Sequence, residues 1–207
     1  MTKIILTRHG HVDWISPERY RGRAELALSE LGHKQIKETA QRIASQWQPT
    51  AIYTSPMGRC IETGQAIAEA YPLSPKQTAM DGLNDIDYGL WQGLTKAEVQ
   101  QKWPRESDDW HNRPHLAEIP HGETIAAVLT RLTHSLYEIL HRHQDETVVL
   151  VGHDSVNRVL LMHAIGLPLS SYWHFKQDPC SISEIDFKNG IFVINRLNET
   201  YHLANRL

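Results

Sequence analysis

The sequence predicts an α/β protein, a three-layer sandwich with a mainly parallel sheet, helices on both faces and an irregular cap segment. Two observations predict this class. Short apolar runs typical of buried strands alternate with longer segments of helical periodicity, and their spacing suits right-handed crossovers between parallel strands. Because no internal repeat or linker divides the chain, we expect a single domain over residues 1–207, with the cap inserted at about residues 72–122.

Five apolar runs bounded by turn residues are predicted to be strands. They cover residues 3–7, 51–54, 147–151, 182–187 and 191–196. The last two flank Asn189-Gly190, a dipeptide typical of two-residue hairpin turns. We therefore expect the chain to end in a β-hairpin.

Four segments of helical periodicity separate these strands. The first begins at Ser29, a good N-cap residue, and ends before Pro49. The second follows Pro56, which suits a first helical turn. The third covers residues 124–143, and the fourth runs from residue 156 to Gly166, a typical residue after a helix C-terminus. The stretch between the second and third helices carries many charges and three tryptophans without clear periodicity, which is typical of a segment that covers a site.

The composition excludes several classes of protein. The chain has 207 residues, 41% hydrophobic and 22% charged, with a formal net charge of −3. This balance gives no electrostatic argument for nucleic acid or an anionic membrane as a partner. No apolar run approaches the ~18 residues of a membrane-spanning helix, and the amino terminus does not resemble a signal peptide. We expect a cytoplasmic protein. Its two cysteines, Cys60 and Cys180, are too few for a disulfide framework.

Two of the predicted strands end in a histidine. His9 follows the first strand and His153 follows the strand at 147–151. Ligand sites of α/β sheets lie at the carboxyl ends of the strands, so these histidines are predicted to face one another there. The alternative is that each lies in an ordinary loop.

Arg8, directly before His9, favours a site for phosphate. A neighbouring guanidinium disfavours a metal cation but binds a phosphate with two parallel hydrogen bonds. Gly10 would let the backbone pass close to a bound group. We interpret His9 as a neutral imidazole that attacks phosphorus while cationic neighbours hold the phosphoryl oxygens.

A zinc site is the main alternative for a chain with 13 histidines. His141 and His143 are two residues apart and would point in different directions on a helix. His111 and His115 are four apart, but Pro114 between them argues against a continuous helix. We therefore expect no metal site.

An ordered set of motifs along nearly the whole chain resembles the histidine phosphatase superfamily, which includes the cofactor-dependent phosphoglycerate mutases. The signature is Leu6-Thr7-Arg8-His9-Gly10. Further segments similar to those of the family are residues 20–22, 28–32, 52–63, 85–95, 122–124, 149–153 and 198–203. The resemblance implies that His9 is phosphorylated during turnover and that Arg8, Arg59 and His153 form a positive pocket around the phosphoryl group.

The chain departs from the family pattern at the proton donor. Where the family usually has glutamate, this chain has Asp85, and an aspartate can serve as a general acid if it lies within ~3 Å of the leaving oxygen. Asp154, directly after His153, is a second candidate, and Asp87 is a third because it would share a face with Asp85 in an extended segment. Arg21 and Asp154 are candidate substrate contacts. Val12 and Ile15 replace the usual threonine and asparagine after the signature, which weakens any transfer of the family's sugar- or glycerate-phosphate contacts.

These observations predict a metal-independent phosphatase without cofactors that hydrolyses small phosphomonoesters through a phosphohistidine. A mutase of the phosphoglycerate type is the alternative, but the family's mutases are typically longer. A second alternative is a phosphate-binding module of low activity on the same fold. The strand edges of the final hairpin would allow a homodimer.

Overall fold

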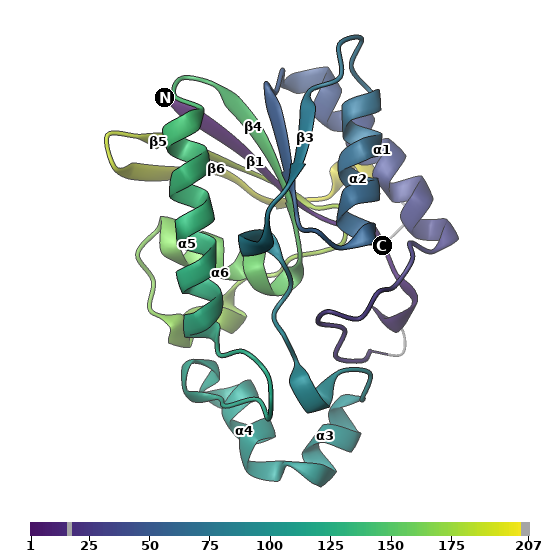
Figure 1. Ribbon diagram of the computed structural model, residues 1–207, viewed down its shortest axis with the longest axis vertical. Helices are drawn as coiled ribbons and strands as arrows, with labels where there is room; N and C mark the ends of the chain where they lie inside the picture. The colour runs from purple at the N-terminus through teal and green to yellow at the C-terminus, as the bar shows by residue number, and fades with distance from the viewer. Residues whose placement is uncertain (16–17, 204–207) are drawn as a thin grey trace.

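The computed structural model describes residues 1–15 and 18–203 (Figure 1). Within them a six-stranded mixed sheet has the strand order β3-β2-β4-β1-β5-β6. The strands are β1 (Thr2–Arg8), β2 (Ala51–Thr54), β3 (Lys76–Ala79), β4 (Thr147–Gly152), β5 (Ile182–Lys188) and β6 (Ile191–Glu199). The first four strands in the sheet order pair in parallel, whereas β5 and β6 pair antiparallel. The predicted α/β class with a mainly parallel sheet is confirmed.

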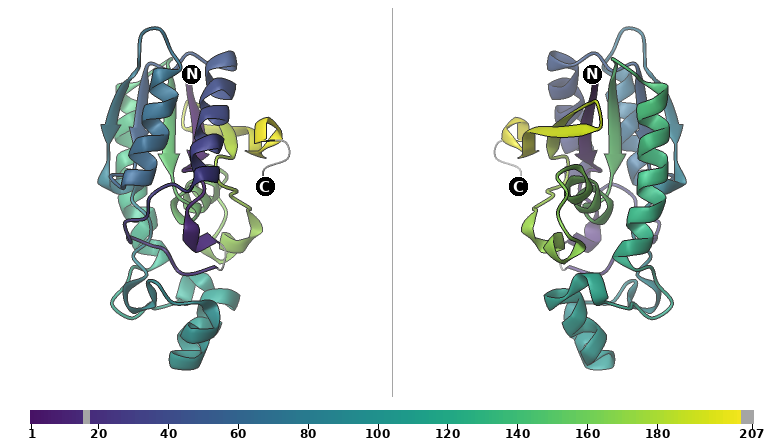
Figure 2. Two further views of the ribbon diagram at one scale, coloured as in Figure 1. Left: turned by 90° about the vertical axis from the view of Figure 1, so that its right-hand side faces the viewer. Right: turned by 90° about the vertical axis from the view of Figure 1, so that its left-hand side faces the viewer.

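Helices cover both faces of the sheet (Figures 1 and 2). They are α1 (Glu30–Gln46), α2 (Gly58–Glu69), α3 (Lys96–Lys102), α4 (Pro104–Asn112), α5 (Ile125–Arg142) and α6 (Asp154–Ala164). Side chains of β1 alternate between the two faces: Ile5 packs with α1 and α2, whereas Ile4 and Leu6 pack in the cluster that holds α5 and α6. The central strands β1, β2 and β4 are therefore buried on both faces, and their carboxyl ends lie at one edge of the sheet. No described helix is long and apolar enough to cross a membrane.

Most of the residues that were predicted to begin or end a helix, or to form a turn, do so in the structure. The Ser29 side chain accepts a hydrogen bond from the Gly32 N–H and caps α1. Gly166 has φ +69° just beyond α6, and Asn189 and Gly190 both have positive φ in the β5–β6 turn. The expectation for Pro56 is wrong: α2 begins at Gly58, because Pro56 lies in a turn in which the Ser55 hydroxyl accepts from the Met57 N–H.

The stretch expected to be irregular contains three regular elements, namely β3, α3 and α4. α3 and α4 lie below the carboxyl ends of the parallel strands (Figure 2). Trp91 and Trp110 are buried and pack in the same cluster as α5 and α6. This segment thus shares its apolar core with one face of the sheet, and it is placed beside the strand ends.

Candidate active site

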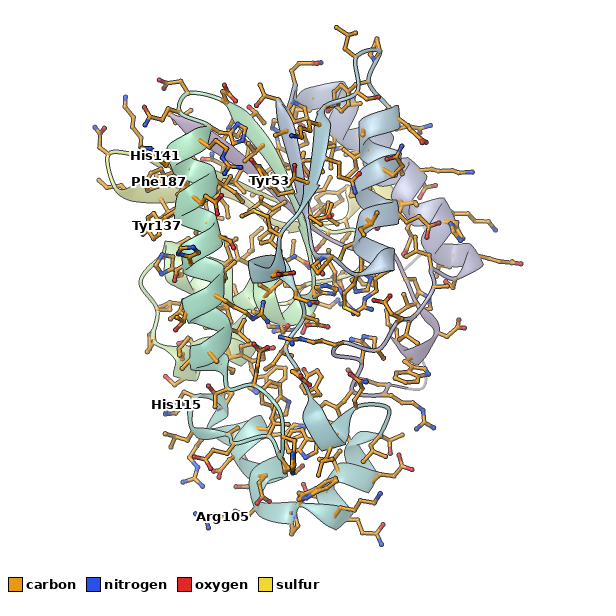
Figure 3. The ribbon with its side chains drawn as sticks, viewed as in Figure 1. Tyr53, Arg105, His115, Tyr137, His141 and Phe187 are labelled. Atoms are coloured by element: carbon orange, nitrogen blue, oxygen red, sulfur yellow. The ribbon has the colours of Figure 1, made fainter. Side chains whose placement is uncertain are left out.

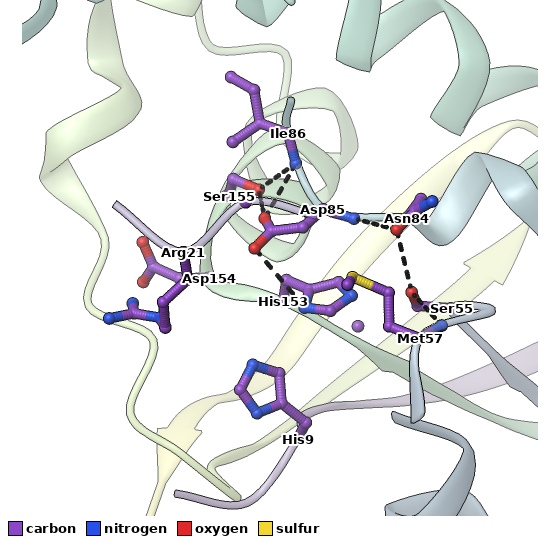
Figure 4. A network of polar contacts seen from close by, with 12 residues as sticks. His9, Arg21, Ser55, Met57, Asn84, Asp85, Ile86, His153, Asp154 and Ser155 are labelled. Carbon is purple, nitrogen blue, oxygen red and sulfur yellow. Dashed lines mark hydrogen bonds and ion pairs between the residues drawn. The ribbon is translucent and has the colours of Figure 1, made fainter. Parts of the chain in front are cut away.

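The carboxyl edge of the sheet brings the two strand-end histidines together. Arg8 of β1 is opposite Gly152 of β4 in the parallel register, so His9 and His153, the next residues, are neighbours. Their ring centroids are 5.1 Å apart with an interplanar angle of 62°. The prediction that they meet at this edge is confirmed (Figure 4).

His9 is held as a neutral imidazole with a defined tautomer. Its Nδ1 is 2.7 Å from the Gly10 carbonyl oxygen, which can only accept, so Nδ1 carries the proton. Its Nε2 accepts from the Arg59 Nε–H at 3.2 Å. Burial, reinforced by the charges of Arg59, His153 and Arg8, lowers the pKa of His9 well below its ordinary value. The Nε2 lone pair of His9 is therefore free of a proton at neutral pH, as a nucleophile requires.

Arg59, in the first turn of α2, is the cation closest to this nitrogen. It is 1% exposed, and its Nη1 and Nη2 groups donate to the carbonyls of Ala24 and Gly22 at 2.8 Å each. The loop after β1 thus fixes the guanidinium plane. Nη2 also lies 3.3 Å from Nδ1 of His153, so one guanidinium contacts both imidazoles.

His153 is neutral as well when no anion is bound. Burial, followed by the charges of Arg59 and Arg8, lowers the pKa of His153 well below its ordinary value. Its Nε2 lies 3.4 Å from Sγ of Cys60, and burial raises the pKa of that thiol, so the cysteine is protonated. The permanent positive charge of the site therefore comes from the arginines.

Arg8 contributes a second buried guanidinium. Its Nη1 donates to the Gln177 carbonyl at 2.6 Å and lies 3.9 Å from Asp154. Within the described residues, the buried Nε of Arg8 has no hydrogen-bond partner. A buried donor without a partner costs free energy, and a bound phosphoryl oxygen is an acceptor that would suit it.

Asp85 is the carboxylate that reaches His153 (Figure 4). It is 7% exposed, with Oδ2 at 3.6 Å from Nη2 of Arg59 and 3.7 Å from Nδ1 of His153. Its other oxygen, Oδ1, accepts from the Ile86 N–H at 2.9 Å and from the Ser155 hydroxyl. The two oxygens thus have different surroundings: Oδ1 is occupied by donors, and Oδ2 faces the basic groups.

The other two candidate acids are engaged elsewhere. Asp87 accepts from the Gly89 N–H at 2.8 Å and lies 3.7 Å from Arg23, so its carboxylate is engaged by these two groups. Asp154 binds Arg158, one helical turn further along α6, through both oxygens at 3.0 Å.

A cleft of about 500 Å³ opens beside Arg8 and Asp154. Its other lining residues combine aromatic rings with charged groups: Glu18, Arg19, Tyr20, Arg21, Tyr88, Lys96, Trp110, His111, Arg158, Trp173, Lys176, Gln177 and Asp178. Arg21 donates to the Trp14 carbonyl at 3.0 Å, and it forms no ion pair with a carboxylate among residues 1–15 and 18–203. Its guanidinium is therefore available to an anionic group in the cleft.

Gly10 has a packing role that the sequence did not suggest. A Cβ at this position would lie 2.8 Å from Cγ2 of Ile36 and 2.9 Å from the Gly32 carbonyl oxygen. The glycine thus lets the loop after β1 pack closely against α1, and its own carbonyl orients His9.

Sequence reasoning missed several residues that hold the site. Arg158 could have been found, because Asp154 and Arg158 have the i, i+4 spacing of a helical ion pair. Ser155 and Arg131 carried no local signal. Arg131 binds Glu123 at 2.9 Å and donates to the backbone carbonyl of Asp85 at 3.0 Å, a contact across 46 positions of the chain.

The two pairs of histidines considered for zinc lie in different parts of the molecule. α4 ends at Asn112 before Pro114, so His111 and His115 are not on one helix, as predicted. His115 and His141 lie toward opposite ends of the molecule (Figure 3). The described residues contain no group of three or more histidine, cysteine or acidic side chains that could hold a metal ion.

A buried pair of arginines around an unprotonated imidazole, at the carboxyl edge of an α/β sheet, defines an enzyme of phosphoryl transfer. A family model described as histidine phosphatase superfamily (branch 1) matches residues 4–200. The chain belongs to this superfamily.

Relatives of similar length carry two different activities in their names. A protein of Hydrogenobacter thermophilus named phosphoserine phosphatase 1 is 37% identical, over 99% of this chain and 95% of its own length. A 2,3-bisphosphoglycerate-dependent phosphoglycerate mutase of Brucella anthropi is 28% identical, over 98% of this chain and 96% of its own length. The solved structure of Bacillus stearothermophilus YhfR is 28% identical with a TM-score of 0.91, covering 98% of this chain and 100% of its own. Because the mutase has nearly the length of this chain, length does not separate the two activities, contrary to our expectation.

Proposed function

We propose that this protein is a metal-independent phosphatase that hydrolyses small phosphomonoesters through a phosphohistidine on His9. The observation that carries the proposal is the state of His9. Its Nδ1 proton is held by the Gly10 carbonyl, and its Nε2 lone pair points at a buried guanidinium. A phosphoryl group bound to Arg59 would place phosphorus next to that lone pair.

In the first step Nε2 of His9 attacks phosphorus, and the bond from phosphorus to the leaving oxygen breaks as the N–P bond forms. Asp85 gives its proton from Oδ2 to the leaving oxygen, so the product is a neutral alcohol. Arg8 and Arg59 stabilise the phosphoryl oxygens. The dianion also favours protonation of His153, which then donates to the same group.

In the second step water attacks the phosphohistidine. The Asp85 carboxylate accepts a proton from this water, the P–N bond breaks, and His9 leaves as the neutral imidazole with which the cycle began. Inorganic phosphate then departs through the cleft.

The geometry favours Asp85 over Asp154 as the acid and base. Oδ2 of Asp85 is within 4 Å of both His153 and Arg59, whereas both oxygens of Asp154 are engaged by Arg158. A carboxylate in a bidentate ion pair is a poor proton donor.

We further propose that the substrate carries a carboxylate next to the phosphate ester, as in phosphoserine. The relative at 37% identity is named for phosphoserine, and Arg21 offers a guanidinium at the cleft that has no carboxylate partner among the described residues. The predicted cap contributes Tyr88, Lys96, Trp110 and His111 to the same cleft, which supports a role in selecting the leaving group. A cytoplasmic location and a homodimer through the edge strand β6 belong to the same proposal.

The mutase activity of the Brucella relative is the second candidate, supported by its matching length. The discriminating experiment supplies phosphoserine and a phosphoglycerate to the purified protein in the presence of EDTA. We expect inorganic phosphate as the main product from both. Dominant formation of the isomeric phosphoglycerate would assign the protein as a mutase, and no turnover across a broad phosphomonoester panel would assign it as a binding module.

A further inference from the structure

Ser155 occupies a position that the proposed reaction does not yet use. It is the second residue of α6, directly after Asp154, and is 3% exposed. Its hydroxyl donates to Oδ1 of Asp85, across 70 positions of the chain. The Ile86 N–H lies 2.9 Å from the same Oδ1 and 3.2 Å from the Ser155 oxygen. Ser155, Asp85 and Ile86 thus form one closed group (Figure 4).

This arrangement makes the two carboxylate oxygens chemically unequal. Oδ1 already receives two hydrogens, so a proton on that atom would point at other donors. Oδ2 instead faces two basic side chains: Nη2 of Arg59 lies at 3.6 Å and Nδ1 of His153 at 3.7 Å. The acidic proton of Asp85 therefore belongs on Oδ2, the oxygen that faces the phosphoryl site.

The backbone of Asp85 is held independently of Ser155. The Asp85 N–H donates to Oδ1 of Asn84 at 2.9 Å, and the Asp85 carbonyl accepts from Arg131 at 3.0 Å. Loss of the serine hydroxyl would remove one of the two acceptors near the Ile86 N–H, but these two bonds would keep the backbone of Asp85 in place while its side chain becomes freer to rotate.

We propose that Ser155 is a positioning residue that locks Asp85 with Oδ2 toward the leaving oxygen and selects the oxygen that carries the proton. This inference rests on the proposed acid role of Asp85. It also explains how an aspartate, shorter by one methylene than the family's usual glutamate, is fixed: a hydroxyl from the neighbouring helix holds its far oxygen. Ser155 itself transfers no proton to the substrate.

The test uses leaving groups that differ in their need for a proton. Nitrophenolate leaves without protonation, whereas the alkoxide of phosphoserine requires an acid. For Ser155→Ala we expect kcat on phosphoserine to fall about tenfold, the effect of losing one hydrogen bond to a charged group, with KM within twofold. In a single turnover, nitrophenolate release from p-nitrophenyl phosphate reports only the first step, which needs no acid for this leaving group, so its rate should stay within twofold. Ser107→Ala is the matched control, because Ser107 is also buried and its hydroxyl has no partner among the described residues. It should leave the ratio of the two activities unchanged.

The same measurement on Asp85→Asn and on the double variant separates the two proposals. If Ser155 acts through Asp85, adding Ser155→Ala to Asp85→Asn should cause less than a twofold further loss on phosphoserine. Equal losses on both substrates for Ser155→Ala, or no loss on either, would overturn the inference about Ser155. A phosphoserine-specific loss in Asp85→Asn alone would still support the acid. If Asp85→Asn itself leaves the ratio unchanged, the acid role of Asp85 is wrong, and the inference about Ser155 fails with it.

Discussion

The floor of the site and the wall of the cleft are built in opposite ways. The floor consists of His9, Arg59, Asp85 and His153, all at most 7% exposed, and backbone groups hold Arg59, His9 and Asp85 in one orientation. The wall is assembled from separate loops and short helices, and Trp173, one of its rings, is 41% exposed.

This difference indicates that the floor and the wall have different roles in the reaction. The floor meets the phosphoryl group and the oxygen that links it to the leaving group, which all phosphomonoesters share, so its groups are fixed in advance for one transition state. The wall meets the leaving group, which differs between substrates. Changes in Arg59 or the histidines should therefore lower kcat for every substrate, and changes in Asp85 should matter most for leaving groups that need a proton. Changes in the wall should alter KM for particular substrates.

The largest effect is expected for Arg59→Met. This change removes the cation that contacts both His9 and His153, and kcat/KM for any phosphomonoester should fall about 10²–10³-fold. Arg105→Met, at an exposed position on α4 (Figure 3), is the control and should stay within twofold. If Arg59→Met kept phosphate release within tenfold of the native rate, the floor would not be the catalytic centre.

Replacing each of the two carboxylates should give unequal results. Asp85→Asn removes the proton donor, so we expect about a hundredfold loss of kcat on alkyl phosphates. Asp154→Asn weakens the pair with Arg158 and the longer contact with Arg8 without removing the proton donor, and it should cost less than tenfold. Steady-state phosphate release from phosphoserine measures both. The reverse order of losses would move the acid to Asp154.

A substitution in the wall of the cleft should weaken substrate binding and leave the rate of the chemical steps nearly unchanged. Arg21→Gln should raise KM for phosphoserine about tenfold, because one charge-assisted contact to the carboxylate is lost, with kcat nearly unchanged. For p-nitrophenyl phosphate, which has no carboxylate, KM should not move. An equal rise of KM for both substrates would show that Arg21 binds the phosphoryl group and belongs to the floor.

The smallest effect concerns stability against pH. The pKa values of His9 and His153 are lowered in the folded protein, so their contribution is complete above about pH 6.5 and is lost as the pH falls through that value toward the folded pKa. In that window the unfolded chain takes up protons that the buried imidazoles do not. The loss is at most about 1.4 kcal/mol per pH unit for each histidine.

Urea unfolding at pH 7.5 and pH 5.5 measures this loss. His9→Gln should lose less free energy of unfolding between these two pH values than the native protein does. Equal losses in both proteins would contradict the buried, neutral state of His9.

The sequence predicts the parts of this molecule that local pattern determines. β1 and β4 are apolar runs stopped by polar residues, so both strands and the histidines after them were predicted nearly to the residue. Arg59 was predicted from the resemblance of residues 52–63 to the family's motifs, because local pattern alone does not distinguish it from an exposed helix arginine. By contrast β3, whose residues include Lys76, Gln77 and Thr78, lies at the edge of the sheet and has no apolar pattern. Its pairing with β2, rather than its composition, makes it a strand.

The residues that position the acid could not be predicted in this way. Ser155 and Arg131 contact Asp85 across 70 and 46 positions of the chain, and only the folded sheet and helices bring them there. The choice between Asp85, Asp87 and Asp154 depended on these contacts. Asp87 is engaged by the Gly89 N–H and Arg23, and Asp154 by Arg158, and the spacing of the aspartates reveals neither.

The most direct test of the account is to trap the intermediate on His9. Native protein is mixed with phosphoserine labelled in its phosphoryl group and quenched in alkali within milliseconds. We predict a label that is stable to base, labile to acid and located on the peptide that contains His9, and no label in His9→Ala. Turnover by His9→Ala at the native rate, or a label on any other residue, would contradict the mechanism.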